Sequence, residues 1–170
     1  MQYGIYLDSG CYDFSLDYWK VNLWNNEFLF NNGCLLDPTL WQEAITNGSA
    51  QQLQWLKEKN CPWDAKAAFS QSVNIPALQW LQNNGYDKLK DTHQYAFEDA
   101  AKHGALKELK WMRENGWPWS ETFCKTAALN HNFEIFKWAV EEGCPVNFTE
   151  CKEDTSKAIL NYIKQRENKQ

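Results

Sequence analysis

The sequence lacks an excess of basic residues, a long apolar run and an amino-terminal leader. Its 17 Lys and Arg against 22 Asp and Glu give a net charge of −5, whereas nucleic-acid binders usually present a basic face. It has no apolar run of about 18 residues, so no membrane span is predicted. Residues 1–8 carry neither the basic region nor the apolar region of a signal peptide. We therefore expect no nucleic acid or membrane as partner, and a cytoplasmic location.

The sequence also lacks the signatures of catalysis and of metal binding. It contains no Gly-x-Ser-x-Gly, no glycine-rich phosphate loop and no His-Glu-x-x-His. None of its six cysteines forms a Cys-x-x-Cys pair, and His93, His103 and His131 are not at zinc-site spacing. Without a leader, the cysteines are expected to stay reduced. The sequence predicts no enzyme activity, no cofactor and no metal.

Tryptophan is present in excess, with ten residues in 170, and its placement is periodic. Four tryptophans anchor a repeated pattern, with Phe28 and Tyr162 as its outer members. Successive anchors are 24 to 31 residues apart. Such a period indicates supersecondary units that stack on one another. The four anchors are Trp55, Trp80, Trp111 and Trp138.

The residues around each anchor follow a shared pattern. Apolar residues precede it by two and five positions, as Leu53 and Ala50 precede Trp55, which is the stripe of an amphipathic helix. The anchor tryptophans are expected on this stripe, in the core between units. Five residues after every anchor except Tyr162 stands a residue type that ends helices in the left-handed conformation. These residues are Gly33, Asn60, Gly85, Gly116 and Gly143.

A further helix is predicted to start after each stop. Good N-cap residues stand nine positions after the anchors, at Asp37, Asp64, Ser120 and Asn147. Pro38 is predicted at a first helical position, and capping boxes are predicted for Asn147 with Glu150 and for Asp91 with Gln94. Small or apolar residues follow, at Ala44-Ile45, Ala100-Ala101 and Ala127-Ala128. Each unit is thus two helices of about ten residues, which bury their apolar faces only against identical neighbours.

Two segments resemble the helical core of the ankyrin repeat. Residues 100–116 carry the resemblance, as do residues 127–143, in which His131 stands where glycine is usual. The Gly-Cys-Pro-Val-Asn segment at 143–147 is similar to the closing loop of that repeat. The period near 27 and the absence of Thr-Pro-Leu-His depart from common units of about 33 residues, so long hairpin fingers are not expected. The short unit with its "CPW" loops resembles a variant of the repeat that is abundant in giant DNA viruses of protists and in some protists.

The pattern and the resemblance together predict an all-α, ankyrin-like helical-repeat solenoid of about five helix-turn-helix units with atypical ends. Residues 1–20 are expected to form an N-terminal cap or arm. Residues 21–170 are expected to form the solenoid and its C-terminal capping helix. The resemblance covers about residues 21–165 and is strongest over 41–147.

The resemblance implies a binding surface at the end of the first helix of each unit, on the concave side. The candidate residues differ from unit to unit: Thr46, Asn47, Gln71, Ser72, Lys102, His103, Leu129 and Asn130. Trp63 and Trp119 stand in the loops, where they either pack or contact a partner. Cys34, Cys61 and Cys144 share one repeat position that Tyr86 and Trp117 occupy elsewhere, which favours packing over thiol or metal chemistry.

We therefore expect a non-catalytic scaffold that binds a partner protein through its concave face and loop tips. A viral origin would make the partner a host protein. Two alternatives stay open, a self-assembling component of a virion or assembly and an adaptor that recruits substrates for degradation. An enzyme that uses Cys124 and a nearby histidine is a third class.

Overall fold

The computed structural model describes residues 30–31, 33, 35–47, 49–70, 73–89 and 91–168. Within these ranges the chain forms helices, turns and loops and no strand, so the predicted all-α class is confirmed. The cap or arm at residues 1–20 and the anchor Phe28 lie outside the described residues. In the part of the chain that is described, every helix is too short or too polar to cross a lipid bilayer.

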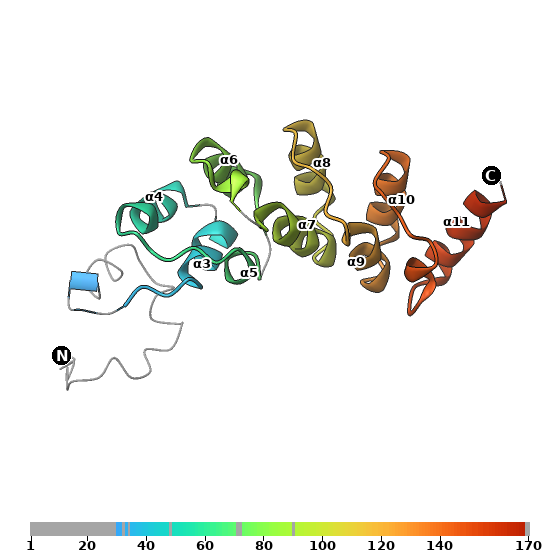
Figure 1. Cartoon of the computed structure of the whole chain (residues 1–170), viewed down its shortest axis with the longest axis horizontal. Coiled ribbons are helices and arrows are strands. Elements are labelled where there is room, and N and C mark those ends of the chain that lie inside the picture. The colour runs from blue at the N-terminus through green and yellow to red at the C-terminus, as the bar shows by residue number, and fades with distance from the viewer. Residues whose placement is uncertain are drawn as a thin grey trace, which may run out of the picture.

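The helices lie in two rows (Figure 1). The first row contains α3 (Leu40–Asn47), α5 (Ala65–Ala68), α7 (Thr92–Lys102) and α9 (Phe123–Leu129). The second row contains α4 (Ala50–Glu58), α6 (Ile75–Asn83), α8 (Leu106–Glu114) and α10 (Phe133–Glu141). The chain closes with α11 (Lys157–Glu167), and two 3-10 turns, η1 (Tyr86–Lys88) and η2 (Glu150–Lys152), lie in the connections.

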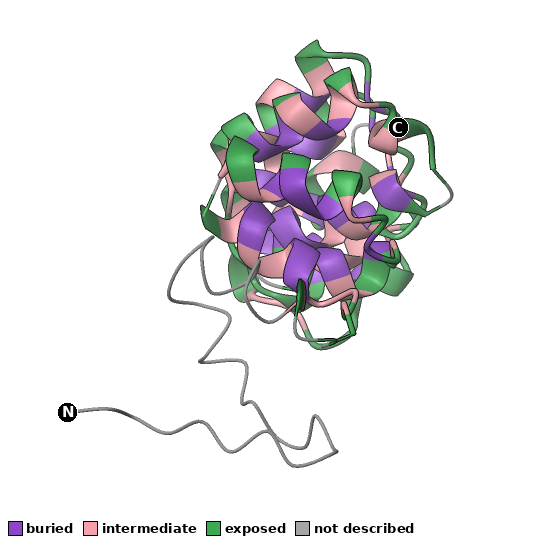
Figure 2. Cartoon of the chain, turned by 90° about the vertical axis from the view of Figure 1, so that its left-hand side faces the viewer, coloured by how far each residue is buried: buried purple, intermediate pink, exposed green. Residues whose placement is uncertain are grey.

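Close contacts join elements that are near in the sequence. Helix α3 packs on α4, α5 and α6, while α7 packs on α5, α8 and α9. Helix α10 packs on α9 and α11. The first described helices and α11 therefore lie at opposite ends of the molecule (Figure 1). Seen from one end, the buried residues gather toward the middle and the exposed residues toward the outside (Figure 2).

The core of the second row is built from residues beside the anchors. Trp55 is buried, with 8% of its surface exposed, but Trp80, Trp111 and Trp138 are only half-buried. The expectation that all four anchors lie in the core is therefore wrong for three of them. These three indoles pack against the core from its edge, and other residues on the same stripe fill the interior. They are Leu53, Leu56, Leu78, Leu81, Leu109, Met112, Phe136 and Ala139.

The first row is buried through small residues, as the sequence predicts. Ala44, Ala100 and Ala127 are almost completely buried, as are the residues that follow each of them. Alanine leaves space for a neighbouring helix to approach, while Trp41 and Phe97 fill the wider gaps. The contact between α7 and α9 is built in this way.

The predicted helix stops are confirmed. Gly33, Gly85, Gly116 and Gly143 all have φ near +80°, and Asn60 has φ of 55°. At Asn60 the side-chain amide tolerates the left-handed conformation that other non-glycine residues avoid. The backbone N–H of the residue after the stop closes the helix end, as Cys61 N–H does with the Leu56 carbonyl at 2.9 Å.

The predicted helix starts are confirmed in part. Asp64 caps α5 by accepting the N–H groups of Lys66 and Ala67. Asp37 accepts the N–H and hydroxyl of Thr39, but α3 begins at Leu40, so Pro38 lies in the preceding turn and not at a first helical position.

The remaining caps depart from the prediction. Ser120 accepts the N–H of Thr122. The N-cap of α9 is Thr122 and not the predicted Ser120. Asn147 accepts the Thr149 N–H and donates to the Glu150 carboxylate, which are not the backbone bonds of the predicted capping box, and a 3-10 turn follows instead of an α-helix. The predicted capping box of Asp91 with Gln94 is wrong. Asp91 has φ of 62°, and this left-handed backbone turns its carboxylate away from the start of α7.

In two of the predicted helix pairs, the first helix is much shorter than the ten or so residues predicted. Helix α5 is a single turn, because Phe69 leaves the helical conformation to bury its ring in the core. The fifth unit has only η2, where Cys151 is the one buried side chain. Tertiary packing overrides helix propensity in these segments.

Side chains at the starts of the second helices bridge neighbouring pairs. Asn74, which caps α6, donates to the carbonyls of Ile45 and Thr46 at the end of α3, at 2.7 and 2.8 Å. Asn132 donates in the same way to the carbonyl of Ala101 at the end of α7. Before α11, the Thr155 hydroxyl donates to the Ala128 carbonyl at 2.9 Å. We call these the bridging residues.

Candidate functional site

The structure places the candidate residues at the carboxyl ends of first-row helices. Thr46 and Asn47 end α3, Lys102 and His103 end α7, and Leu129 and Asn130 end α9. Gln71 and Ser72 lie outside the described residues. The row thus brings three pairs of unlike residues to equivalent positions, one pair for each helix.

Local hydrogen bonds engage the amides among these residues. Asn47 donates to Glu43, and Asn130 donates to the Thr126 carbonyl. Leu129 is 42% exposed, although it is apolar. Lys102 is exposed at the end of α7, so both a charged and an apolar group are presented to solvent along this edge.

The loop tryptophans are packed and half-buried. The ring of Trp63 lies 5.1 Å from Trp41 and 4.8 Å from Tyr86, with Phe69 at its far edge. These contacts join the loop after α4 to α3, α5 and η1. Trp63 therefore acts mainly as packing, the first of the two interpretations.

Trp119, at the same position after the anchor Trp111 as Trp63 after Trp55, has the same role. Its ring lies 5.3 Å from Phe123 and from Trp138, and 5.7 Å from Phe97. The guanidinium of Arg113 lies 4.4 Å from the ring centroid, a cation–π contact on the remaining face.

Two cysteines of the repeat position, Cys61 and Cys144, are packed in the core, as predicted, whereas Cys34 lies outside the described residues. Cys61 and Cys144 are buried, as are Cys124 and Cys151, and all four are free thiols. Burial, with the nearby Asp37 carboxylate, raises the pKa of the Cys61 thiol to about 11. Burial raises the pKa of Cys151 to about 11 as well. At neutral pH both are thiols and not the thiolates that act as nucleophiles.

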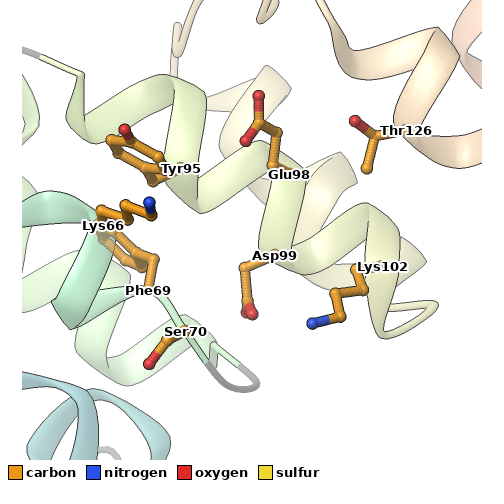
Figure 3. Close-up of a pocket in the computed structure, with 8 residues that line it drawn as sticks. All are labelled: Lys66, Phe69, Ser70, Tyr95, Glu98, Asp99, Lys102 and Thr126. Carbon is orange, nitrogen blue, oxygen red and sulfur yellow. The ribbon is translucent and has the colours of Figure 1, made fainter.

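A cavity of about 310 Å³ opens on the first row between α5, α7 and α9 (Figure 3). Two rings and two cations contribute to its wall, from Phe69 and Tyr95 and from Lys66 and Lys102. Ser70, Glu98, Asp99 and Thr126 complete the lining. Lys102 is the only sequence-predicted candidate among these lining residues.

Asp99 is the buried charge of this cavity. Its side chain is 2% exposed, and Oδ1 lies 3.0 Å from Nδ1 of His103, one turn further along α7. Its other oxygen, Oδ2, has no hydrogen-bond partner among the described residues. Burial raises the pKa of Asp99 to about 6, although His103, Lys102 and the Val73 backbone lower it in part.

Glu98 and Ser70 are held by neighbouring helices. Glu98 accepts the hydroxyl of Thr122 and the amide of Gln94, and Figure 3 shows its carboxylate directed away from that of Asp99. The Ser70 hydroxyl donates to Gln42 on α3. Lys102 is exposed, and in the same view its ammonium group points toward the side of the cavity where Asp99 lies.

The sequence analysis missed Asp99, although a signal was present. Asp99 lies three residues after Ala96, on the same buried helix stripe. A carboxylate at an apolar position of an amphipathic helix is rarely buried without a purpose, since burying a charge is costly. The rest of the lining had no signal, because α5 ends after one turn and Phe69 and Ser70 reach the cavity from a loop.

The comparisons with known proteins give no family for the chain. No protein-family profile, curated protein or solved structure matches it. Among the described residues, no group of three or more His, Cys, Asp and Glu side chains is placed to hold a metal ion. The geometry of the first row is therefore the basis for a functional proposal.

Proposed function

We propose that the chain is a non-catalytic protein-binding module, built as an ankyrin-like helical-repeat solenoid whose first row forms the binding surface. One observation carries the proposal. Each of α3, α7 and α9 buries an alanine and the residue after it, while the two residues at its carboxyl end differ from helix to helix and are exposed, apart from the half-buried Thr46. A constant frame with variable exposed positions is what a family of binding scaffolds requires.

The proposed partner is a protein, because the surface is extended and carries mixed chemistry. Positive charge at Lys102, an exposed leucine at position 129 and amides at Asn47 and Asn130 are spread over three helices. A small ligand is normally enclosed by one concave pocket, whereas protein interfaces cover many residues on each side. If the repeat style reflects a viral origin, the partner is a host protein in the cytoplasm, and the module recruits or sequesters it.

Affinity capture with a matched pair of variants tests the proposal. The test variant replaces Lys102, His103 and Asn130 by Ala and Leu129 by Ser. The control variant replaces four exposed residues of the second row by Ala, namely Gln51, Gln79, Lys107 and Glu134. Captured proteins are identified by mass spectrometry from the lysate of the cells in which the chain is found.

We expect the control variant to retain the partners of the wild-type chain and the test variant to lose at least 90% of them, since loss of central contacts costs about tenfold or more in affinity. Equal recovery by both variants would show that the first row is not the binding surface. Light scattering of the purified chain at rising concentration separates binding to another protein from self-assembly.

A further inference from the structure

Three buried thiols lie near one another toward the C-terminal end of the helix stack. Cys124 lies on α9, Cys144 directly follows the helix stop Gly143, and Cys151 is the only buried side chain of η2. Each of the three is at most 4% exposed. The proposed binding surface uses none of them, so their mutual contacts decide whether they only pack or also react.

The repeated architecture brings Cys124 and Cys144 together. Trp41 stands at the same place relative to Cys61 as Cys124 does relative to Cys144. The Trp41 indole N–H donates to the Pro62 carbonyl at 3.1 Å, and its side chain contacts that of Cys61. In the pair formed by α9 and α10 the same two places hold cysteines, and their thiols share a hydrogen bond. The fold therefore holds two thiols in contact at a pair of places that contact each other elsewhere in the chain.

The two thiols of this pair have different roles in the hydrogen bond. The Cys144 thiol donates to the Pro145 carbonyl at 3.6 Å, which leaves its sulfur free to accept the S–H of Cys124. This bond lowers the pKa of Cys144, with help from the Arg113 guanidinium and against the effect of burial. The same bond, together with burial, raises the pKa of Cys124. Cys144 is thus the thiol that ionises first, and the thiolate is the form that reacts with oxidants.

A small oxidant can reach Cys144, although a bulky reagent is excluded. The residues on both sides of it, Gly143 and Pro145, are exposed, so the chain at Cys144 lies close to the surface. The adjacent turn η2 is held by one buried side chain, that of Cys151, and a short turn of this kind opens easily. Hydrogen peroxide is little larger than a water molecule, whereas iodoacetamide needs a larger opening.

The other two described cysteines lack this arrangement. Cys61 packs against Trp41 and not against a second thiol, and burial raises its pKa to about 11. Burial and the Glu150 carboxylate raise the pKa of Cys151 to about 11 as well. Both stay protonated at neutral pH, so they serve as internal controls for oxidation.

We propose that Cys124 and Cys144 form a reversible disulfide when the protein meets hydrogen peroxide. The Cys144 sulfur attacks one peroxide oxygen, so that an S–O bond forms, the O–O bond breaks and a first water leaves. The Cys124 sulfur then attacks the Cys144 sulfur, the S–S bond replaces the S–O bond, and a second water leaves with the Cys124 proton. Two thiols lose two electrons, and one peroxide is reduced to two waters.

The disulfide would join α9 covalently to the turn that ends α10. Such a link restricts the open states of the segment between the two cysteines. Amide hydrogen exchange in α9 and α10 should therefore slow by about tenfold or more in the oxidised chain. This role is independent of the proposed function, because it needs no partner.

Peroxide treatment of the reduced full chain tests the proposal. After treatment at neutral pH, the remaining thiols are blocked with N-ethylmaleimide in guanidinium, and the chain is digested without reductant and mapped by mass spectrometry. We expect a peptide pair linked through Cys124 and Cys144, with Cys61 and Cys151 recovered as blocked thiols. Dithiothreitol should restore the starting chain and its rate of hydrogen exchange.

Three variants separate the two roles. C124S should leave a sulfenic acid at Cys144, which dimedone traps, because no second thiol is present to resolve it. C144S should leave Cys124 as an unlabelled thiol. C61S removes the cysteine at the same repeat position as Cys144 and should form the disulfide like the wild type. Thermal unfolding confirms that each variant is folded.

Three results would overturn the proposal. The first is recovery of both Cys124 and Cys144 as thiols from folded wild-type chain, at a peroxide dose that oxidises free cysteine. The second is a disulfide from Cys151 to either of them, which would make the assigned pair wrong. The third is dimedone labelling of Cys124 in C144S, which would reverse the assigned order of attack. Capture of partners by the four-residue variant bears on the proposed function alone.

Discussion

At the scale of single residues, Asp99 has an unusual balance of interactions. A carboxylate on the buried stripe of α7 loses its hydration and regains one contact with His103. Burial is the larger effect, because the pKa of Asp99 is raised to about 6 from the usual value of 3.8. The charged form is therefore less stable in the folded protein than in the unfolded chain.

The stability of the protein should thus depend on pH through Asp99. Between about pH 4 and pH 6 the folded protein keeps a proton that the unfolded chain has released, so the contribution of Asp99 to stability falls as pH rises across this window. D99N removes this slope and should raise the free energy of unfolding at pH 7 by about 2 kcal/mol.

Urea unfolding of the wild type and D99N from pH 3.5 to pH 7.5 measures the difference. E134Q controls for the loss of one negative charge at an exposed site. A wild-type minus D99N difference that stays flat across this range would show that the Asp99 carboxylate is solvated.

The buried thiols give a second prediction at this scale. Cys61, Cys124, Cys144 and Cys151 should resist iodoacetamide at pH 7.5 in the native protein and react at once in guanidinium. The pKa of Cys124 is raised by its hydrogen bond with Cys144 and by burial, which keeps it protonated. Peptide mapping by mass spectrometry assigns each site. Fast native modification of Cys124 would favour the enzyme alternative.

At the scale of elements, the bridging residues connect three of the pairs of helices to the pair before them. Asn74 donates two hydrogen bonds to the end of α3 and accepts the N–H of Ala77 at the start of its own helix. It therefore caps two helices at once. Asn132 also donates to the end of a first-row helix, at the Ala101 carbonyl, but its side chain makes no capping hydrogen bond to its own helix α10.

Replacing Asn74 by Ala should cost about 2 kcal/mol, since it removes an N-cap and leaves two carbonyls without their donor. Asn83 is an exposed residue at the end of the same helix, and N83A should change stability by less than about 0.5 kcal/mol. Urea unfolding of both variants gives the comparison. Equal destabilisation would mean that the bridge contributes nothing beyond helix propensity.

The elements also show what the sequence could and could not predict. The stops at Asn60 and Gly116 were predictable, because a left-handed residue is a local requirement with few solutions. The second helices were predictable from their stripe. The single-turn α5 and the 3-10 turn η2 were not, because burial of Phe69 and Cys151 decides where those helices end.

The candidate site was predicted only at its edge. Lys102 was identified by its place beside the end of α7. The bridge from Asn74 joins residues 28 and 29 positions apart, and the cavity joins Lys66 to Thr126, so neither is visible to local pattern analysis. Long-range pairings of this kind need the arrangement of the rows.

At the scale of the whole molecule, contacts between near neighbours make stability local. Leu109 and Ile163 are both completely buried, but Leu109 lies in the middle of the stack and Ile163 in α11 at its end. Replacing either by Ala should cost about 2–5 kcal/mol. Because α11 makes its close contacts with α10, however, this end of the described chain can open without the middle.

Native-state hydrogen exchange distinguishes the two positions. I163A should lower protection in α10 and α11 and leave α3 to α7 unchanged, whereas L109A should lower protection on both sides of α8. A uniform loss of protection in I163A would show that the chain unfolds as one cooperative unit.

The bridging residues are not distributed evenly, and this has a mechanical consequence. Ala105 starts α8 with backbone angles close to those of Asn132, at φ −80° and −82°, but an alanine has no group that can reach the end of α5. Under tension the link between α5 and α8 should therefore be the most compliant, and force should open the stack there first. In single-molecule stretching, A105N should raise the force of the first opening event by stiffening the weakest joint.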